Sequence, residues 1–251
     1  MSESTDLRPR PLLPSGAPAS SRALLAVAVG GLALVALCDV FSLFAGIRLR
    51  AVINGDGGFA TAPQQELDAA ASLYDTAGRF QVMVYLPAAI VFVVWFFRMR
   101  RNTGLLTPDR FRNGPGWAIG AWLIPLVNLW MPYRVAFDMW GAATQLPTEG
   151  ETHRTRAWPL NLWWALFVFS VLFNRYAGQK YRNAETLTEI KDAVGQYMAA
   201  DVVHIAAAAA AIHFAVRLTA MQRRKAVEGL YRPSVVKETS AWHLPSRPGH
   251  F

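Results

Sequence analysis

The chain has 251 residues, of which 53% are hydrophobic and only 17% are charged, and it contains 9 Trp and 14 Phe. This composition is typical of a multi-span membrane protein and argues against an ordinary soluble domain. The net charge of +8 does not require a nucleic-acid partner, because Lys and Arg collect in the cytoplasmic loops of membrane proteins. The single cysteine, Cys38, excludes a disulfide framework and a thiolate metal cluster.

The N-terminal segment, residues 1–22, is rich in Pro and Ser and is predicted to be a disordered cytoplasmic tail. Residues 23–47 form an apolar run with one charge, Asp39, and we predict the first membrane-spanning helix there. This run is longer than the ~7–15-residue core of a signal peptide, so we expect it to be retained.

A Gly-rich turn at residues 54–58 precedes the second predicted helix. Thr61 and Gln64 have the spacing of a capping box, and the helix that they open is predicted to continue into a second span over residues 80–97. A basic run follows at residues 98–102, which is typical of the cytoplasmic end of a span.

The third apolar segment, residues 117–131, is interrupted by Pro125 and Asn128 and is followed by Pro132. At ~1.5 Å per residue this segment reaches roughly 22 Å as a helix, less than the ~30 Å of a hydrocarbon core. We therefore predict a Pro-broken helical element over residues 117–145, either re-entrant into the membrane or lying at its interface.

Two further apolar segments, residues 158–176 and 198–221, are predicted to span the membrane, and residues 226–251 are predicted to form a second disordered cytoplasmic tail. The first of these spans opens with tryptophans that are predicted to form an interfacial aromatic belt. These are Trp158, Trp163 and Trp164.

The charge distribution distinguishes two topologies. If residues 117–131 are re-entrant, most of the 25 Lys and Arg lie on one side of the membrane; if they cross, the basic residues divide almost evenly. Excess Lys and Arg belongs on the cytoplasmic side. We therefore predict an all-α integral membrane protein with a membrane domain over residues 23–225, four transmembrane helices, one re-entrant element and two cytoplasmic termini. Five spans is the alternative.

A pattern of Trp, Pro, Asn and basic residues resembles the actinobacterial membrane-protein family called domain of unknown function 4328. The resemblance is specific over residues 91–145 and weaker over 146–225. It implies a multi-span bacterial membrane protein and no particular activity. The residues that carry it are Trp95, Arg98, Asn102, Gly114, Pro115, Gly116, Trp117, Trp122, Pro125, Asn128, Leu129, Trp130, Pro132, Tyr133, Arg217, Leu218, Thr219 and Gln222.

Ionisable residues inside predicted spans are candidate functional groups, because they are costly in a membrane. Asp201 and His204 share one helix face, and together with Asp39 they could form a relay that carries protons or coordinates a cation. The alternative is structural: Asp39 pairs with Arg175 or His204 to fix helix packing, and Asp201 lies at the membrane interface.

Two more polar residues are candidates. His213 is predicted to form a hydrogen-bonded contact between helices. Asn128 lies near the tip of the broken element, where it either satisfies backbone groups freed by the break or faces a permeant species.

The chain contains no GxxxxGK[ST], HExxH, GxSxG or CxxC motif, so we expect neither an enzyme nor a bound metal or cofactor. We expect a plasma-membrane protein that binds a partner protein, a second copy of itself or anionic lipid through its basic cytoplasmic face. The alternative is a small transporter or channel component that uses the broken helix and the intramembrane Asp and His residues. The predicted headgroup-binding residues are Arg98, Arg100, Arg101, Arg223, Arg224 and Lys225.

Overall fold

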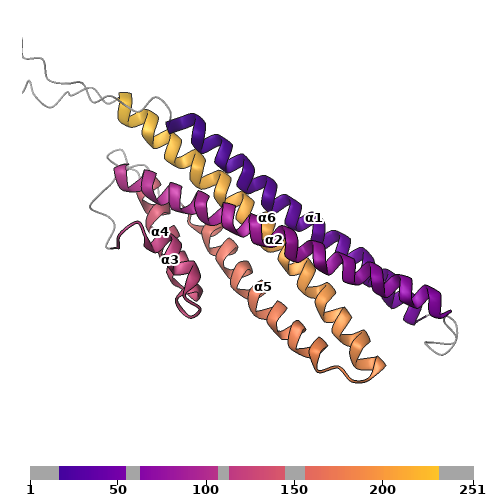
Figure 1. The fold of residues 1–251 in the computed structure, drawn as a ribbon. Coiled ribbons are helices and arrows are strands. Elements are labelled where there is room, and N and C mark those ends of the chain that lie inside the picture. Colours follow the sequence, from indigo (N-terminus) through magenta and orange to yellow (C-terminus); the bar gives the residue numbers. More distant parts are fainter. Residues whose placement is uncertain (1–16, 55–62, 107–112, 145–155, 232–251) are drawn as a thin grey trace, which may run out of the picture.

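The computed structural model describes residues 17–54, 63–106, 113–144 and 156–231, and within these ranges every regular element is helical (Figure 1). The predicted all-α fold class is therefore confirmed for the described residues. The elements are α1 (Ala17–Ile53), α2 (Gln64–Leu106), α3 (Trp117–Leu123), the 3-10 turn η2 (Val127–Leu129), α4 (Met131–Ala143), α5 (Trp158–Arg182) and α6 (Leu187–Tyr231).

Four long helices form an antiparallel bundle. α1 packs along both α2 and α6, and α5 packs along α6. The start of α1 and the ends of α2 and α6 lie at one end of the bundle, which we call the terminal end (Figure 1). The end of α1, the start of α2 and the α5–α6 connection lie at the opposite end. This alternation of direction is the one that successive membrane spans require.

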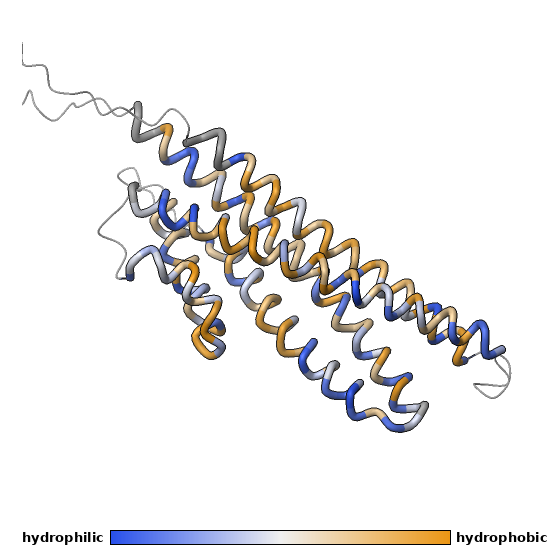
Figure 2. Tube along the Cα trace, viewed as in Figure 1, coloured by the Kyte–Doolittle hydropathy of each residue, from blue (hydrophilic) through white to orange (hydrophobic). Residues whose placement is uncertain are grey.

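Within the described residues, three helices are long and apolar enough to cross a membrane, namely Arg22–Ile53, Gln64–Gly104 and Thr188–Val227. Apolar residues continue along these helices (Figure 2), and many large ones face outward, including Leu37 and Met83. An exposed apolar surface of this extent is typical of a lipid-facing surface.

The predicted span over residues 158–176 corresponds to α5, which has 25 residues but is not among the three spanning candidates. Its polar residues explain the difference: Asn161, Asn174 and Arg175 interrupt the apolar stretch, and the last turn carries Lys180 and Arg182. The structure therefore confirms three membrane-capable helices and leaves the fourth span a prediction.

The long helices extend beyond the predicted spans. α1 begins at Ala17, inside the predicted tail of residues 1–22, and α6 continues to Tyr231, beyond residue 226. α2 runs without interruption from Gln64 into the second predicted span, as expected; Thr61, the predicted cap, lies outside the described residues.

The start of α6 shows how local chemistry extends a helix beyond its apolar core. Glu189 accepts hydrogen bonds from the backbone N–H groups of Glu185 and Thr186, at 2.9 and 3.0 Å. In return the Thr186 hydroxyl accepts one from the Glu189 N–H, at 3.3 Å. This reciprocal arrangement is a capping box, which satisfies N–H groups that have no partner within the helix.

The broken element folds as a helical hairpin of α3, η2 and α4. α3 ends at Leu123, and the next residue, Ile124, is extended (φ −93°, ψ 114°) because it directly precedes Pro125, and a residue before proline avoids the helical conformation. Pro132 lies in the first turn of α4, where its missing N–H removes no hydrogen bond. At about 10 and 20 Å, neither helix reaches the ~30 Å of a membrane core. Whether the hairpin enters the membrane remains a prediction.

Basic residues hold both ends of the hairpin at the terminal end of the bundle. The Arg100 guanidinium of α2 donates a hydrogen bond to the Asn113 carbonyl at 2.9 Å. Lys225 Nζ of α6 donates to the carbonyls of Ala142 and Thr144 at 2.6 and 3.2 Å. The hairpin therefore starts and finishes at the same end of the bundle, which is the geometry that a re-entrant element needs.

Aromatic side chains fill the space between the hairpin and the long helices. The rings of Trp163 and Phe214 stack with centroids 4.3 Å apart and an interplanar angle of 5°, and Phe214 also contacts Trp95 and Trp140. We call these four residues the aromatic core.

The predicted aromatic belt is wrong for one of its members. Trp163 is 2% exposed and belongs to the aromatic core, whereas Trp158 is 54% exposed and can face lipid. Positions five residues apart are rotated by roughly 140° on a helix, so the two rings cannot lie on the same face.

Candidate ligand-binding cavity

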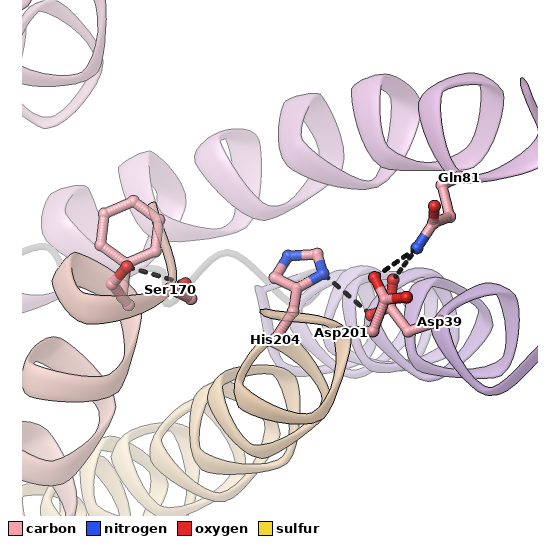
Figure 3. A network of polar contacts seen from close by, with 6 residues as sticks. Asp39, Gln81, Ser170, Asp201 and His204 are labelled. Atoms are coloured by element: carbon pink, nitrogen blue, oxygen red, sulfur yellow. Dashed lines mark hydrogen bonds and ion pairs between the residues drawn. The ribbon is translucent and has the colours of Figure 1, made fainter. Parts of the chain in front are cut away.

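Four polar side chains from three helices meet inside the bundle and form what we call the polar cluster: Asp39 of α1, Gln81 of α2, and Asp201 and His204 of α6 (Figure 3). Gln81 Nε2 donates hydrogen bonds to Asp39 Oδ1 at 2.8 Å and to Asp201 Oδ1 at 2.9 Å. His204 Nδ1 lies 2.8 Å from Asp39 Oδ2. The Gln81 amide thus bridges the two carboxylates, and the His204 imidazole contacts that of Asp39.

Both carboxylates of the polar cluster are buried, with Asp39 1% and Asp201 6% exposed. Small side chains on α6, including Ala200 and Ala207, allow its neighbours to approach closely. A buried carboxylate is tolerated only when hydrogen bonds or counter-charges replace the water that it has lost. Helix packing therefore brings the cluster together, and its hydrogen bonds make the burial possible.

A cavity of about 740 Å³ adjoins the polar cluster. It is bordered by side chains of α1, α2, α5 and α6, and the hairpin adds Trp122 from α3 and Asn128 from η2. Its walls are mostly apolar and rich in aromatic rings, whereas the carboxylates provide charge. We call five of these rings the aromatic wall: Tyr85, Phe92, Trp122, Trp163 and Phe167.

Three buried polar atoms of the cavity lining lack a hydrogen-bond partner within the described part of the chain. They are Asp201 Oδ2, Asn128 Oδ1 and Trp122 Nε1. The buried Ser42 hydroxyl lies beside Asp201. Buried polar atoms are normally satisfied, so unpartnered ones around a cavity are positions where a bound molecule can form hydrogen bonds.

The structure brings together the predicted relay residues. Asp39, Asp201 and His204 lie in one hydrogen-bonded group, and the ionic partner of Asp39 is His204. This geometry is compatible with a functional role for the group and with a purely structural one. His213 lies elsewhere: its ring stacks on Trp158 with centroids 5.4 Å apart, a ring contact in place of the predicted hydrogen bond.

Several residues of the family pattern serve in packing, whereas others, such as Trp117 and Trp130, are exposed. Trp95 is fully buried in the aromatic core, the Tyr133 hydroxyl donates to Asn161 Oδ1 at 3.0 Å, and the Thr219 hydroxyl donates to the Ala215 carbonyl at 2.8 Å. Trp122 and Asn128 border the cavity as well. The pattern therefore places the hairpin against the bundle and completes one wall of the cavity.

Of the six predicted headgroup-binding residues, Arg98 is exposed and Arg223 is half-buried, and the other four divide into two groups. Arg100 and Lys225 point inward and bind backbone carbonyls of the hairpin, so they are not available for lipid as predicted. Arg101 and Arg224 are exposed at the terminal end of the bundle. The two basic runs, distant in sequence, thus lie at the same end.

Sequence reasoning missed Gln81, although it is the bridge of the polar cluster. Its signal was present, because a glutamine near the start of the apolar run 80–97 is unusual in a spanning helix. Gln81 was missed because only charged residues were considered as candidates.

Among the described residues, no three His, Cys, Asp or Glu side chains are grouped as ligands for one metal ion.

The fold and the cavity define a helical protein with three membrane-capable helices and a polar cluster buried among its long helices. The chain belongs to the family described as Domain of unknown function (DUF4328), whose model matches residues 60–220. This confirms the resemblance seen in the sequence. The match includes Gln81, Asp201 and His204, whereas Asp39 precedes it. No curated protein and no solved structure matches the chain.

Proposed function

We propose that this chain is a non-enzymatic membrane protein that acts as a small transporter or channel component, with the cavity as its ligand site. The observation that carries the proposal is the polar cluster, which places two buried carboxylates beside a cavity of about 740 Å³. Ionisable side chains inside a membrane typically mark the paths of ions, protons or solutes. Helix packing alone would need the contacts of the cluster but not the adjoining cavity.

The broken hairpin supports this proposal. η2 contributes Asn128 to the cavity lining, and irregular backbone is tolerated at membrane depth where it lines a polar cavity. Helices interrupted in this way form the binding sites of many transporters. In the proposed arrangement the hairpin is re-entrant, and Asn128 faces the ligand.

The proposed topology has four spans, α1, α2, α5 and α6. α5 packs along α6, so a membrane crossed by α6 also surrounds α5. The terminal end of the bundle carries both basic runs, which places this end and both termini in the cytoplasm of a bacterial cell. The membrane is then the plasma membrane.

Flux measurements in vesicles test the proposal. Purified full-length protein in liposomes is expected to raise the flux of protons, potassium ions or tetraethylammonium above that of protein-free liposomes. Asp39→Asn and Asn128→Leu are each expected to reduce this flux about tenfold, equivalent to ~1.4 kcal/mol. The matched control is Asp192→Asn, because Asp192 is exposed on α6 and lies outside this cavity.

Two results would refute the transporter proposal. One is a flux of all three ions no greater than in protein-free liposomes. The other is an increased flux that neither Asp39→Asn nor Asn128→Leu changes. Equal orientation of the variants in the liposomes is checked by protease access to the C-terminal tail.

A second function is favoured by the terminal end, where the ends of α2 and α6 are joined by the hydrogen bond from Gln222 to Thr103 and carry the exposed Arg101 and Arg224. Clusters of basic residues next to a span bind anionic lipid headgroups. In the proposed arrangement these two residues contact anionic lipid, and a protein partner with an acidic surface is the competing occupant.

Thermal unfolding in nanodiscs tests this second function. Phosphatidylglycerol should stabilise the protein relative to phosphatidylcholine, and Arg101→Ala with Arg224→Ala should remove that difference. Arg175→Ala with Lys180→Ala, near the opposite end of the bundle, is the control. Equal stability in the two lipids would exclude anionic-lipid binding at this face.

A further inference from the structure

The polar cluster carries more negative charge than its own residues can balance. Asp39 and Asp201 supply two carboxylates, and His204, even when protonated, supplies one positive charge. The described residues that line the cavity include a third carboxylate, that of the exposed Asp75, and no Lys or Arg. An unbalanced charge is costly away from bulk water. A proton or a cation from outside the chain must therefore complete this site.

The position for that cation is set by Asp201. Of the four carboxylate oxygens in the polar cluster, three lie within hydrogen-bond distance of Gln81 or His204. The fourth, Asp201 Oδ2, is buried and accepts no hydrogen bond within 3.5 Å among the described residues, and the buried Ser42 hydroxyl is the polar group that lies beside this carboxylate. Figure 3 shows the two carboxylates side by side beneath the Gln81 amide. A donor that reaches Asp201 Oδ2 can interact with the negative charge of both.

The walls of the cavity determine what kind of group carries the charge. Tyr85 lies next to His204, with ring centroids 5.7 Å apart, and Trp122 contacts both Phe92 and Phe167 further along the cavity. Aromatic faces attract ammonium groups and pack well against apolar bodies. These walls suit an organic cation better than a strongly hydrated inorganic ion.

The length of the cavity fits a molecule with distinct ends. Along α2 the lining extends from Tyr74 to Val93, about 28 Å at the helical rise, of which the part from Gln81 to Phe92 takes about 16 Å. The charged cluster lies at the Gln81 level, and the unpartnered Trp122 Nε1 contributes a donor near Phe92. A volume of about 740 Å³ lies within the range of pockets that take small organic ligands.

We propose that the cavity binds an organic monocation, a protonated amine on an apolar or aromatic body. The ammonium group donates to Asp201 Oδ2 and lies close to Asp39, and the body lies against the aromatic wall. This inference rests on the proposed function, because it names the ligand of the same cavity. It makes Asp201 the specificity-determining residue and the aromatic wall the contact for the ligand body.

A charge series on one ring system tests the inference with the unmodified protein. The probes are 1-naphthylmethylammonium, 1-naphthylmethanol and 1-naphthoate, which share a ring and differ in charge. Binding is measured by equilibrium dialysis of the purified full-length protein in detergent, against the same micelles without protein. The cation is expected to bind at least tenfold more tightly than the alcohol or the carboxylate, a difference of about 1.4 kcal/mol.

Two variants locate the bound cation. Asp201→Asn keeps the shape of the side chain and removes its charge, and it should weaken binding of the cation at least tenfold while leaving binding of the alcohol unchanged. Asp192→Asn, on the exposed surface of the same helix, should leave binding of both unchanged. The charge series needs no variant, so it remains decisive if Asp201→Asn does not fold.

The inference is overturned if the three probes bind equally, if none binds, or if the carboxylate binds best. It is also overturned if Asp201→Asn is folded and binds the cation as well as the unmodified protein does. The proposed function is tested separately by the flux measurements. Cation binding without flux would support the ligand class and refute transport. Flux without a preference for the cation would support transport and refute the ligand class.

Discussion

Around Phe214, aromatic rings from α2, α4, α5 and α6 fill the space between the helices, whereas around Asp201 the bundle leaves a cavity of about 740 Å³. The first region is held by ring packing and the second by hydrogen bonds from one amide and one imidazole. The contrast indicates a division of roles. The aromatic core fixes the hairpin against the long helices, and the polar region keeps unpartnered atoms beside a space large enough for a ligand.

The largest expected effect on stability is in the aromatic core. Phe214 is fully buried and contacts three aromatic rings, so Phe214→Ala should lower the free energy of unfolding by about 3–5 kcal/mol. The measurement is denaturant unfolding in detergent micelles. Phe169→Ala, which removes an outward-facing ring of α5, is the control and should have a much smaller effect. Equal losses in both variants would remove the distinction between core and surface.

In the polar region, Gln81 is the residue whose loss should be felt most. Gln81→Leu removes both hydrogen bonds that this amide donates to Asp39 and Asp201. Hydrogen bonds to charged groups contribute about 1.5–3 kcal/mol each, and since the two share one side chain we expect a total loss of about 2–3 kcal/mol. The same unfolding assay measures it.

The control for Gln81→Leu is Gln64→Leu, because Gln64 bonds only an exposed carboxylate, that of Asp68, in the first turns of the same helix. Little change is expected there, since exposed pairs contribute little. If Gln81→Leu stabilised the protein, the polar cluster would not hold α1, α2 and α6 together, and the contrast with the aromatic core would need another cause.

A close approach of α1 and α2 connects the two regions. A Cβ atom at Gly31 would lie 3.3 Å from the Cβ of Ala88, whereas one at Gly30 would meet nothing within 4 Å. Gly31→Leu should therefore push the helices apart and lower the free energy of unfolding by about 2 kcal/mol. Gly30→Leu, one residue away, should be neutral or raise stability by up to about 1 kcal/mol, because leucine favours helix more than glycine does.

The same two glycine variants test whether the cavity depends on this contact. If the α1–α2 distance sets the position of Asp39, Gly31→Leu should also weaken ligand binding, and Gly30→Leu should not. Similar unfolding curves for both variants would show that the helices are not closely packed at Gly31.

The candidate site could be predicted from the sequence where charge was conspicuous. Asp39, Asp201 and His204 interrupt apolar runs, and the i,i+3 spacing of the last two puts them on a common helix face. Gln81 carries no charge and was missed, although it makes the two central hydrogen bonds. The cavity itself could not be predicted, because it depends on how helices pack and on where the hairpin lies.

The hairpin also explains why two basic residues were misassigned. A lysine or arginine at the end of a span can bind either a lipid headgroup or an unpaired backbone carbonyl, and sequence alone does not say which is near. Proline and glycine positions predicted the break in residues 117–131, but not that the hairpin ends would lie against Arg100 and Lys225. Tertiary position decided between two chemically equivalent roles.

The smallest expected effect tests whether Lys225 stabilises the end of α4. Lys225→Ala removes the donor to the carbonyls of Ala142 and Thr144 at the end of α4. It also removes a positive charge beside the C-terminal end of α4, where a cation interacts favourably with the negative end of the helix dipole. We expect a loss of about 1 kcal/mol in the free energy of unfolding and faster amide exchange in the last turn of α4. The neighbouring, exposed Arg224→Ala should change neither. If Arg224→Ala had the larger effect on stability, the terminal end of the bundle would be held by its exposed charges rather than by the cap on α4. The aromatic core and the hydrogen bonds of Arg100 to Asn113 and of Tyr133 to Asn161 would then hold the hairpin against the long helices.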